Sequence, residues 1–248
     1  WEDGYGPALL GGAGTSACHR SSKAGPAIAA ETIREENPGT NVAFTHLACS
    51  GANSDGVSQQ IRDITTRIGN QPIDALLLSV GANDSKGLHP NDDAYWSDGS
   101  FGSVVFDCLE QADCSTDTNI QRGLARKFAD LPSHYAAVAA TIDAMPNAVT
   151  DTYITEYFDP TRDLAGRFGG PITINCTANL IAPVEWEFLY NYEVRPLNAA
   201  VQHAAGFYGW HLVDGIALGF VNHGYCTGDQ AWVVTAQEST ANQLDFNG

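Results

Sequence analysis

Positive charge and long hydrophobic runs are both scarce in this sequence. Lys and Arg number 12 against 29 Asp and Glu, which gives a formal net charge of −17. A chain this acidic repels phosphate backbones and anionic membranes at long range, so nucleic acid is excluded as a partner. No apolar stretch approaches the ~20 residues of a membrane span. No signal-peptide pattern occurs at Trp1 either, so we expect a processed chain without a transmembrane segment.

Metal-binding patterns are missing as well. The six cysteines include no CxxC pair, and no His stands at zinc-finger spacing from them. An even set of cysteines without such spacing favours disulfides in an oxidising, extracellular compartment. Only Cys108 and Cys114 are close enough in sequence to predict a local bridge, and the remaining pairing stays open. We expect no metal and no cofactor.

The chain is long enough for one large domain, residues 1–248. It is 44% hydrophobic, and no linker or internal repeat divides it. Apolar residues at helical spacing predict helices at 26–36, 54–68, 120–145 and 191–208, with a break or kink at Pro132 and an interruption near Pro196. Short apolar runs predict strands at 42–48, 74–80, 148–155 and 210–213, and long excursions occupy about 85–119 and 156–190. This alternation predicts an α/β fold with a parallel sheet and helices on both faces.

A junction between a strand and a loop at residues 76–84 is the most informative stretch. Leu-Leu-Leu-Ser-Val predicts a fully buried strand, and the Gly-Ala-Asn-Asp after it predicts a tight loop. Ligands bind beyond the carboxyl ends of parallel strands, where Asn83 would stand. Its amide donates hydrogen bonds without carrying charge, which suits an oxyanion hole. Asn83 and Asp84 are also typical of ordinary turns.

Four short motifs occur in order: Cys-His-Arg-Ser at 18–21, Ala-Cys-Ser-Gly-Ala at 48–52, Gly-Ala-Asn-Asp at 81–84 and His-Gly-Tyr-Cys at 223–226. Together they resemble the ordered blocks of the SGNH or GDSL hydrolases, most closely the secreted esterases and lipases with three disulfides. The resemblance covers nearly the whole chain, although the excursions match loosely. It implies a flavodoxin-like, doubly wound parallel sheet. It also implies three disulfides, Cys18–Cys49, Cys108–Cys114 and Cys176–Cys226.

In that family a Ser on a Gly-Asp-Ser turn attacks an ester carbonyl and is activated by a His from a late Asp-x-x-His motif. Backbone N–H groups and an Asn side chain hold the oxyanion. The resemblance implies that Gly51 is a backbone donor and Asn83 the side-chain donor. One preorganised donor of this kind can be worth about 2.7–4 kcal/mol of barrier. The alternative for Gly51 is an ordinary turn glycine.

Two of the family's motifs are missing from this sequence. It contains no Gly-Asp-Ser, and no Asp-x-x-His follows Cys226. The resemblance places Gly-Asp-Ser, at the end of the first strand, just upstream of Trp1, and residues 245–248 resemble the run before the catalytic His. We therefore expect the first strand, the nucleophile and the catalytic His outside residues 1–248, and a further segment or chain that completes the sheet.

Residues within the chain are weaker substitutes for the missing groups. Ser16 lies in a loop of small residues, and His89 precedes Pro-Asn but follows the wrong strand. His223 lies near the end of the last strand and could approach a substrate. The resemblance, however, implies that its motif, residues 223–226, supplies a structural disulfide. His211 and Asp214 stand in the wrong order for the motif.

The leading hypothesis is a secreted carboxylic ester hydrolase that acts through a serine acyl-enzyme on lipid, short-acyl or acetylated-glycan esters. Candidate wall residues are aromatic, and ordinary packing explains them at least as well: Tyr95, Trp96, Phe101 and Trp186. The alternative is a catalytically inactive extracellular binding or structural module on the same scaffold, because fold does not imply function. A carbohydrate-binding protein without turnover is a third hypothesis.

Overall fold

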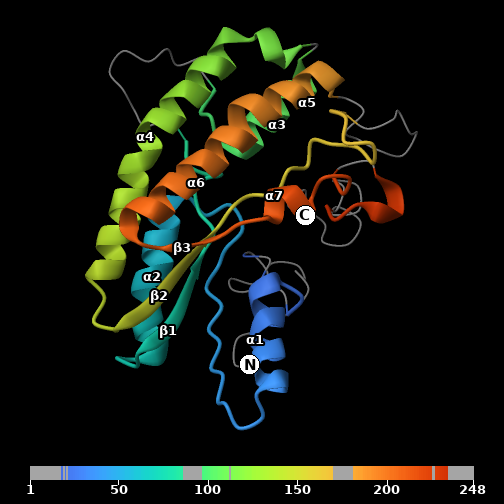
Figure 1. Ribbon diagram of the computed structural model, residues 1–248. Helices are drawn as coiled ribbons and strands as arrows, with labels where there is room; N and C mark the ends of the chain where they lie inside the picture. The colour runs from blue at the N-terminus through green and yellow to red at the C-terminus, as the bar shows by residue number, and fades with distance from the viewer. Residues whose placement is uncertain are drawn as a thin grey trace.

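A three-stranded parallel sheet lies at the centre of the fold, with the strand order β1-β2-β3 (Figure 1). The structure, a computed structural model, describes residues 18, 20, 22–85, 97–111, 113–169, 181–224 and 227–233. The strands are β1 (Ile73–Leu78), β2 (Val149–Thr155) and β3 (His211–Val213). The α/β class and the parallel sheet predicted from the sequence are confirmed.

The two faces of this sheet differ in burial. Leu78 is opposite Ile154, and these side chains are 4% and 0% exposed. One residue earlier, Leu77 is opposite Tyr153 and is 47% exposed. Successive side chains of a strand point to opposite faces, so one face forms the core and the other is partly open. The prediction of a fully buried strand is therefore wrong for Leu77.

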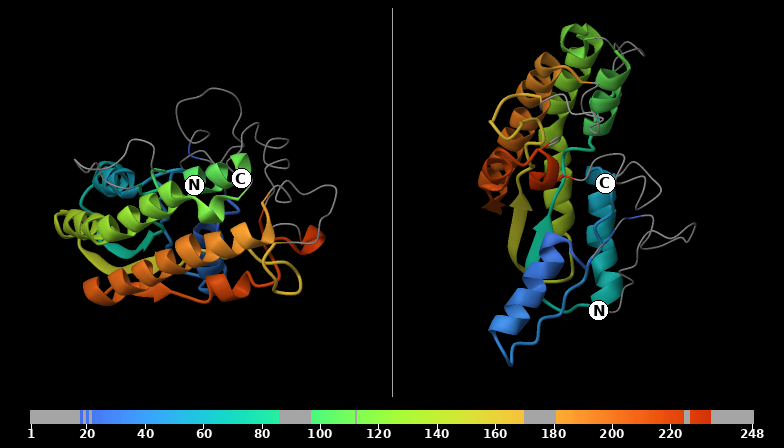
Figure 2. Two further views of the ribbon diagram at one scale, coloured as in Figure 1. Left: turned by 90° about the horizontal axis from the view of Figure 1, so that it is seen from above. Right: turned by 90° about the vertical axis from the view of Figure 1, so that its right-hand side faces the viewer.

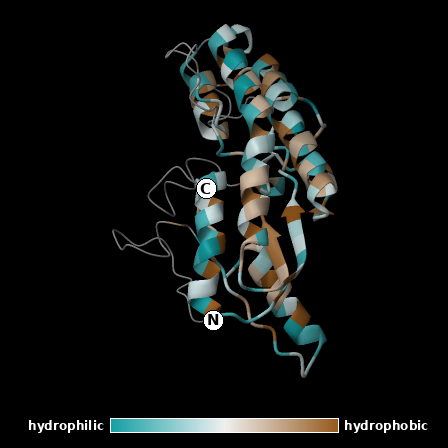
Figure 3. Ribbon diagram, turned by 90° about the vertical axis from the view of Figure 1, so that its left-hand side faces the viewer, coloured by the Kyte–Doolittle hydropathy of each residue, from teal (hydrophilic) through white to brown (hydrophobic). Residues whose placement is uncertain are grey.

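Three long helices pack their apolar sides into the core beside the buried face: α2 (Ser54–Ile68), α4 (Thr118–Asp143) and α6 (Arg195–Tyr208). α4 packs against both α2 and α6 (Figure 1, Figure 2). Ile61, Leu131 and Val201 are examples of the buried side chains that these helices contribute. Hydrophobic residues accordingly appear in brown on the strands and on the helices beside them (Figure 3). No helix in the described part of the chain has the length and hydrophobicity that a membrane span requires.

The helix ends follow local sequence signals. α1 (Gly25–Glu36) has Pro26 in its first turn, where a missing N–H costs nothing. α2 begins after Asn53, whose side chain accepts a hydrogen bond from the Gly56 N–H at 3.0 Å. α4 continues through Pro132 without the break that the sequence predicts there. Leu131 and Tyr135 on either side are buried in the core, and this packing outweighs the lost backbone hydrogen bond.

The helix predicted at 191–208 contains a change from π-helix to α-helix. α5 (Pro183–Leu189) continues into a turn of π-helix, η3 (Tyr190–Val194), and α6 follows. Pro196 lies near the start of α6, a position where proline is tolerated. The helix type changes just before Pro196, but the helical backbone does not break there, and the helical segment begins eight residues earlier than expected, at Pro183 rather than at 191.

Part of the excursion at 85–119 is helical, which the sequence pattern did not predict. α3 (Phe101–Glu110) and the short helix η1 (Cys114–Thr116) pack with α5 in a second apolar cluster. Its buried members include Val104, Leu124 and Trp186. Two short helices, α7 (Ile216–Gly219) and η4 (Gly228–Gln230), follow β3.

The strand predicted at residues 42–48 is wrong, because these residues are assigned to no strand. Among the described residues no strand precedes β1 in the sheet, and β1 pairs with β2 alone. A strand is stabilised by hydrogen bonds to a neighbour, so an apolar run without an adjacent partner forms no ladder. α1, just before this segment, stands apart from α4 and α6 in Figure 1.

Candidate functional site

The loop that follows β1 is built around Gly81. Its φ is +128°, and a Cβ at this position would lie 2.6 Å from the Tyr135 hydroxyl oxygen and 3.0 Å from Leu197 Cδ1. Tyr135 is buried, and its hydroxyl donates to the Val80 carbonyl at 3.2 Å. Only glycine fits both the backbone conformation and this close approach. The chain therefore turns sharply at the carboxyl end of β1.

Ala82 is held through both of its peptide groups. Its N–H donates to the Tyr157 hydroxyl oxygen at 3.2 Å. Its carbonyl accepts from Lys127 Nζ at 3.0 Å and from the Phe101 N–H at 2.9 Å. Burial raises the pKa of Tyr157 to about 12, so this phenol stays neutral at physiological pH. The residue just before Asn83 is thus fixed from α4, from α3 and from the segment after β2.

Asn83 lies beside the turn that contains Gly51. The side-chain Nδ2 of Asn83 donates to the Ala52 carbonyl at 3.3 Å, and both Asn83 and Gly51 are exposed. Gly51 adopts a φ of +77°, in the left-handed region that favours glycine. Nδ2 carries two hydrogens, so one is left for a ligand. The structure therefore places Asn83 beside the Gly51 turn, and the function of the two residues as oxyanion donors stays a prediction.

Asp84 connects this loop to the N-terminus of α2. Its Oδ1 accepts from the Ser54 N–H at 3.1 Å, and its Oδ2 accepts from the Ser54 hydroxyl at 2.8 Å. His134 of α4 lies 3.6 Å from Oδ1. A buried carboxylate at a helix N-terminus interacts favourably with the unpaired N–H groups there. Asp84 therefore has a structural function in this arrangement.

Two disulfides are present in the described part of the chain, Cys18–Cys49 and Cys108–Cys114. Both pairs were implied by the resemblance, and both are confirmed. The third implied pair, Cys176 and Cys226, lies outside the described residues. The first disulfide precedes the Gly51 turn, and the Ser50 N–H donates to the Cys18 carbonyl at 3.2 Å. Covalent and hydrogen bonds thus both attach this turn to the segment before α1.

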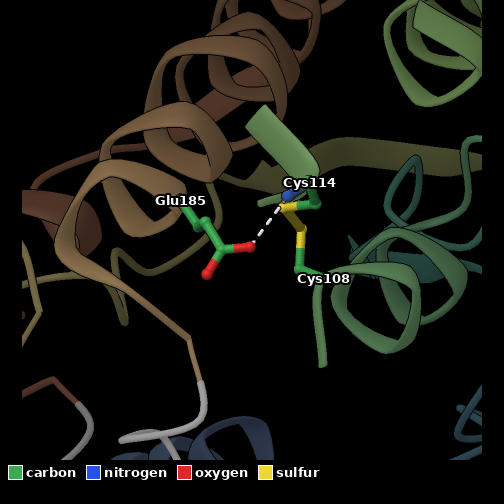
Figure 4. Close-up of side chains that lie close together, drawn as sticks. All are labelled: Cys108, Cys114 and Glu185. Atoms are coloured by element: carbon green, nitrogen blue, oxygen red, sulfur yellow. Dashed lines mark hydrogen bonds between the residues drawn. A yellow bond between two sulfur atoms is a disulfide. The ribbon is translucent and has the colours of Figure 1, made fainter. Parts of the chain in front are cut away.

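The second disulfide lies next to Glu185 (Figure 4). Glu185 Oε1 accepts from the Cys114 N–H at 2.8 Å, and Oε2 accepts from the Ala182 N–H at 2.6 Å. Disulfide sulfurs are not thiolates, which are the form of cysteine that binds metals. The Glu185 carboxylate instead satisfies backbone donors at the start of α5 and at η1, so the cluster is structural.

His223 lies in the loop after α7. Its Nδ1 is 2.6 Å from the Gln230 carbonyl oxygen, and its ring stacks on Trp232 with centroids 4.0 Å apart. Within the described residues no hydrogen bond joins His223 to Gly51 or Asn83. The structure therefore ties His223 to the segment around η4, and its catalytic function stays a prediction.

The other candidates fall outside the loop after β1. His211 contacts Asp151 of β2 at 2.9 Å rather than Asp214, and it stacks on Tyr153 on the partly open face of the sheet. Trp186 is 4% exposed and packs in the second apolar cluster, which agrees with the packing alternative. Phe101 is half-buried at the start of α3. Outside the described residues lie Ser16, His89, Tyr95 and Trp96.

Sequence reasoning missed the charged pair behind the loop. Lys127 of α4 and Glu193 of η3 are both fully buried, with Nζ 2.5 Å from Oε1. A weak signal existed, because Lys127 lies three residues after Leu124 and four before Leu131, both of which face the core. A lysine at a core position of a helix indicates a buried partner.

Comparison with known proteins gives a match in structure alone. No family model matches the sequence, and no curated protein matches it. A solved structure, an extracellular lipase from Streptomyces rimosus, is similar to this chain with a TM-score of 0.63 and 19% sequence identity. The similarity covers 94% of this chain and 86% of the lipase. The chain therefore shares its fold with that lipase.

Proposed function

We propose that this chain forms the oxyanion-binding side of a secreted carboxylic ester hydrolase that acts through a serine acyl-enzyme. The observation that carries the proposal is the position of Asn83, whose amide lies beside the Gly51 turn at the carboxyl end of β1. The shared fold with an extracellular lipase supports it, as do two disulfides. The substrates would be esters of lipids, short acyl groups or acylated glycans.

Stabilisation of the transition state requires hydrogen-bond donors that are already in place when negative charge develops on the carbonyl oxygen. Attack on an ester carbonyl turns its oxygen into an oxyanion, and donors that need no reorganisation stabilise this charge in the transition state. In the proposed site the Gly51 N–H and the Asn83 amide donate to that oxygen. The bonds from Asn83 to Ala52 and from Ser54 to Asp84 keep the two segments together, and the bond from Lys127 to Ala82 holds the loop after β1 against α4. Removal of one such donor typically costs about 10²–10³ in kcat.

In this proposal the nucleophilic Ser and the catalytic His lie outside residues 1–248. A further segment or chain pairs with the edge of β1 that no described strand occupies, and delivers the Ser to the carboxyl end of the sheet. One observation supports the pairing: among the described strands β1 pairs with β2 alone. A second shows that one face of the sheet is partly open, because Leu77 is 47% exposed. Parallel sheets of this class are usually covered on both faces.

His223 is the internal alternative for the general base. Nδ1 faces the Gln230 carbonyl, which favours the tautomer with hydrogen on Nδ1 and leaves Nε2 basic. A histidine oriented in this way by a backbone carbonyl can accept a proton from a nucleophile. A His223→Gln variant tests it, because catalysis would fall by orders of magnitude only if this ring is the base.

Labelling of the full gene product with a serine-reactive fluorophosphonate tests the proposal. We expect stoichiometric labelling, and mass spectrometry should locate the label on a Ser outside residues 1–248. Asn83→Ala should lower kcat for p-nitrophenyl esters by about 10²–10³. Asn119→Ala is a matched control, because Asn119 lies in the first turn of α4 and contributes no side chain to the loop after β1.

Three outcomes would contradict the proposal in different ways. A label on Ser16 or another internal serine would refute the external nucleophile. A folded protein that takes no label would favour the inactive binding module. Normal turnover in Asn83→Ala would remove the oxyanion role of Asn83.

A further inference from the structure

We propose that Lys127 and Glu193 are a positioning pair that sets the orientation and polarity of the peptide group leading into Asn83. The inference deepens the oxyanion function proposed above and rests on it.

The pair lies in the buried interior, where charged groups are energetically unfavourable. Both side chains are 0% exposed, and Lys127 Nζ is 2.5 Å from Glu193 Oε1. Moving an ion from water to such a site costs several kcal/mol, and an apolar pair of similar volume is often no less stable. Stability of the core is therefore a weak reason for these two charges.

The ammonium of Lys127 has a second acceptor, the Ala82 carbonyl at 3.0 Å. This carbonyl and the Asn83 N–H belong to one planar peptide group. A charge-assisted hydrogen bond to the oxygen fixes the plane and draws electron density from the N–H side. The Asn83 N–H thereby becomes a stronger donor, and the peptide plane from which Asn83 extends is held in place.

Glu193 holds the ammonium in that position. It lies in the single π-helical turn between α5 and α6, and such turns are frequent at functional sites. Its Oε2 is buried and has no hydrogen-bond partner among the described residues. Burial raises the pKa of Glu193 to about 7 against the opposing effect of Lys127. The titratable groups that face it are Lys127 from α4 and Tyr157 from the segment after β2.

A double variant distinguishes positioning from a purely structural function. Lys127→Met with Glu193→Met gives unbranched apolar side chains of similar length, removes both charges, and leaves the Ala82 carbonyl with the Phe101 N–H alone. A structural pair would be replaced with little change beyond stability. A positioning pair would leave the fold intact and alter the peptide group of Asn83.

The first measurement is the amide spectrum of the ¹⁵N-labelled chain. In the double variant we expect an upfield shift of the Asn83 amide proton and about tenfold faster hydrogen exchange in the loop after β1. The control is Asp163→Asn with Arg167→Met, which removes another ion pair of a buried carboxylate and should leave Asn83 unchanged. An unchanged Asn83 signal in the Met variant overturns the proposal. If the Met variant does not fold, Glu193→Gln must still shift the Asn83 amide proton, because it removes the charge that holds Lys127.

The second measurement is ester hydrolysis by the full gene product. The Met variant should lower kcat by about 10- to 100-fold with KM within about twofold, because a misplaced donor weakens the transition state more than the ground state. A loss confined to KM overturns the positioning role. If the unmodified gene product hydrolyses no ester, the proposed function fails, whereas the amide signals still decide whether the pair sets the Asn83 peptide.

Discussion

Asp84 accepts hydrogen bonds from both the N–H and the hydroxyl of Ser54, at 3.1 and 2.8 Å, and both residues are buried. Ser54 is the first residue of α2 and lies three residues after Gly51. The loop after β1 and the turn before α2 are therefore one connected unit. Separation of the loop after β1 from the turn before α2 must break these bonds.

Ser54→Ala should lower the free energy of unfolding by about 1–3 kcal/mol, because it leaves a buried carboxylate oxygen without its hydroxyl donor. Ser58→Ala, one turn later in α2, is the matched control. The Ser58 hydroxyl is buried and has no partner among the described residues, so its loss should be neutral or stabilising. Urea unfolding of the two variants measures the difference. Equal effects would show that the Ser54–Asp84 contact contributes nothing.

Gly81→Ala should be strongly destabilising. The new Cβ would lie 2.6 Å from the Tyr135 hydroxyl oxygen, at a φ of +128°. The ring of Tyr135 is buried in the core, so the clash must displace the loop or break the bond from Tyr135 to Val80. Such strain typically costs about 1–3 kcal/mol in addition to the lost hydrogen bond.

Gly102→Ala is the control for this glycine. Gly102 lies in α3, where a Cβ would meet no other atom within 4 Å, and alanine there should stabilise the helix by up to ~1 kcal/mol. Thermal unfolding of both variants should give melting temperatures that move in opposite directions. If Gly81→Ala leaves the melting temperature unchanged, the loop can accommodate a Cβ despite the close contact with Tyr135.

The long helices could be predicted from the sequence because their signals are local. Pro26 marks the start of α1, and apolar residues at helical spacing define the faces of α2 and α4. The strand at 42–48 could not be judged in the same way. A strand depends on a partner that is distant in sequence, and the apolar pattern alone does not reveal whether that partner is present.

The candidate site was predictable to a similar extent. The approach of Asn83 to the Gly51 turn follows from the rule that loops meet at the carboxyl edge of a parallel sheet, and from the resemblance. Lys127 and Glu193 are 66 residues apart, and charged residues are usually solvated. Their burial depends on how α4 packs against η3, which no local pattern encodes.

Acid should weaken the loop at 159–169 through Asp163. Burial alone would raise the pKa of this carboxyl, but hydrogen bonds from the Arg167 backbone and side chain and from the Ala165 N–H hold it below its usual value. Because the folded-state pKa is depressed, the stabilisation is present above the unfolded value of 3.8 and is lost as the pH falls through the folded value.

Asp163→Asn should therefore lower stability at neutral pH, and the difference from the unmodified protein should shrink below about pH 4. Urea unfolding between pH 3 and 7 measures this. Arg167→Met should produce a smaller loss, since the two backbone donors stay in place. A difference that does not depend on pH would show that the carboxylate charge is not what these donors stabilise.

Leu77 and Leu78 offer a test of whether a further segment covers the partly open face of the sheet. In the chain of residues 1–248, Leu78→Ala should cost about 2–5 kcal/mol, because this side chain is 4% exposed in the core. Leu77→Ala should cost less than ~1 kcal/mol, because Leu77 is 47% exposed and leaves little cavity. In the full gene product, a segment that covers the open face would bury Leu77, and its truncation should then cost at least about 2 kcal/mol. Guanidinium unfolding of both variants in both forms measures the change. The same small cost for Leu77→Ala in both would mean that no segment covers this face.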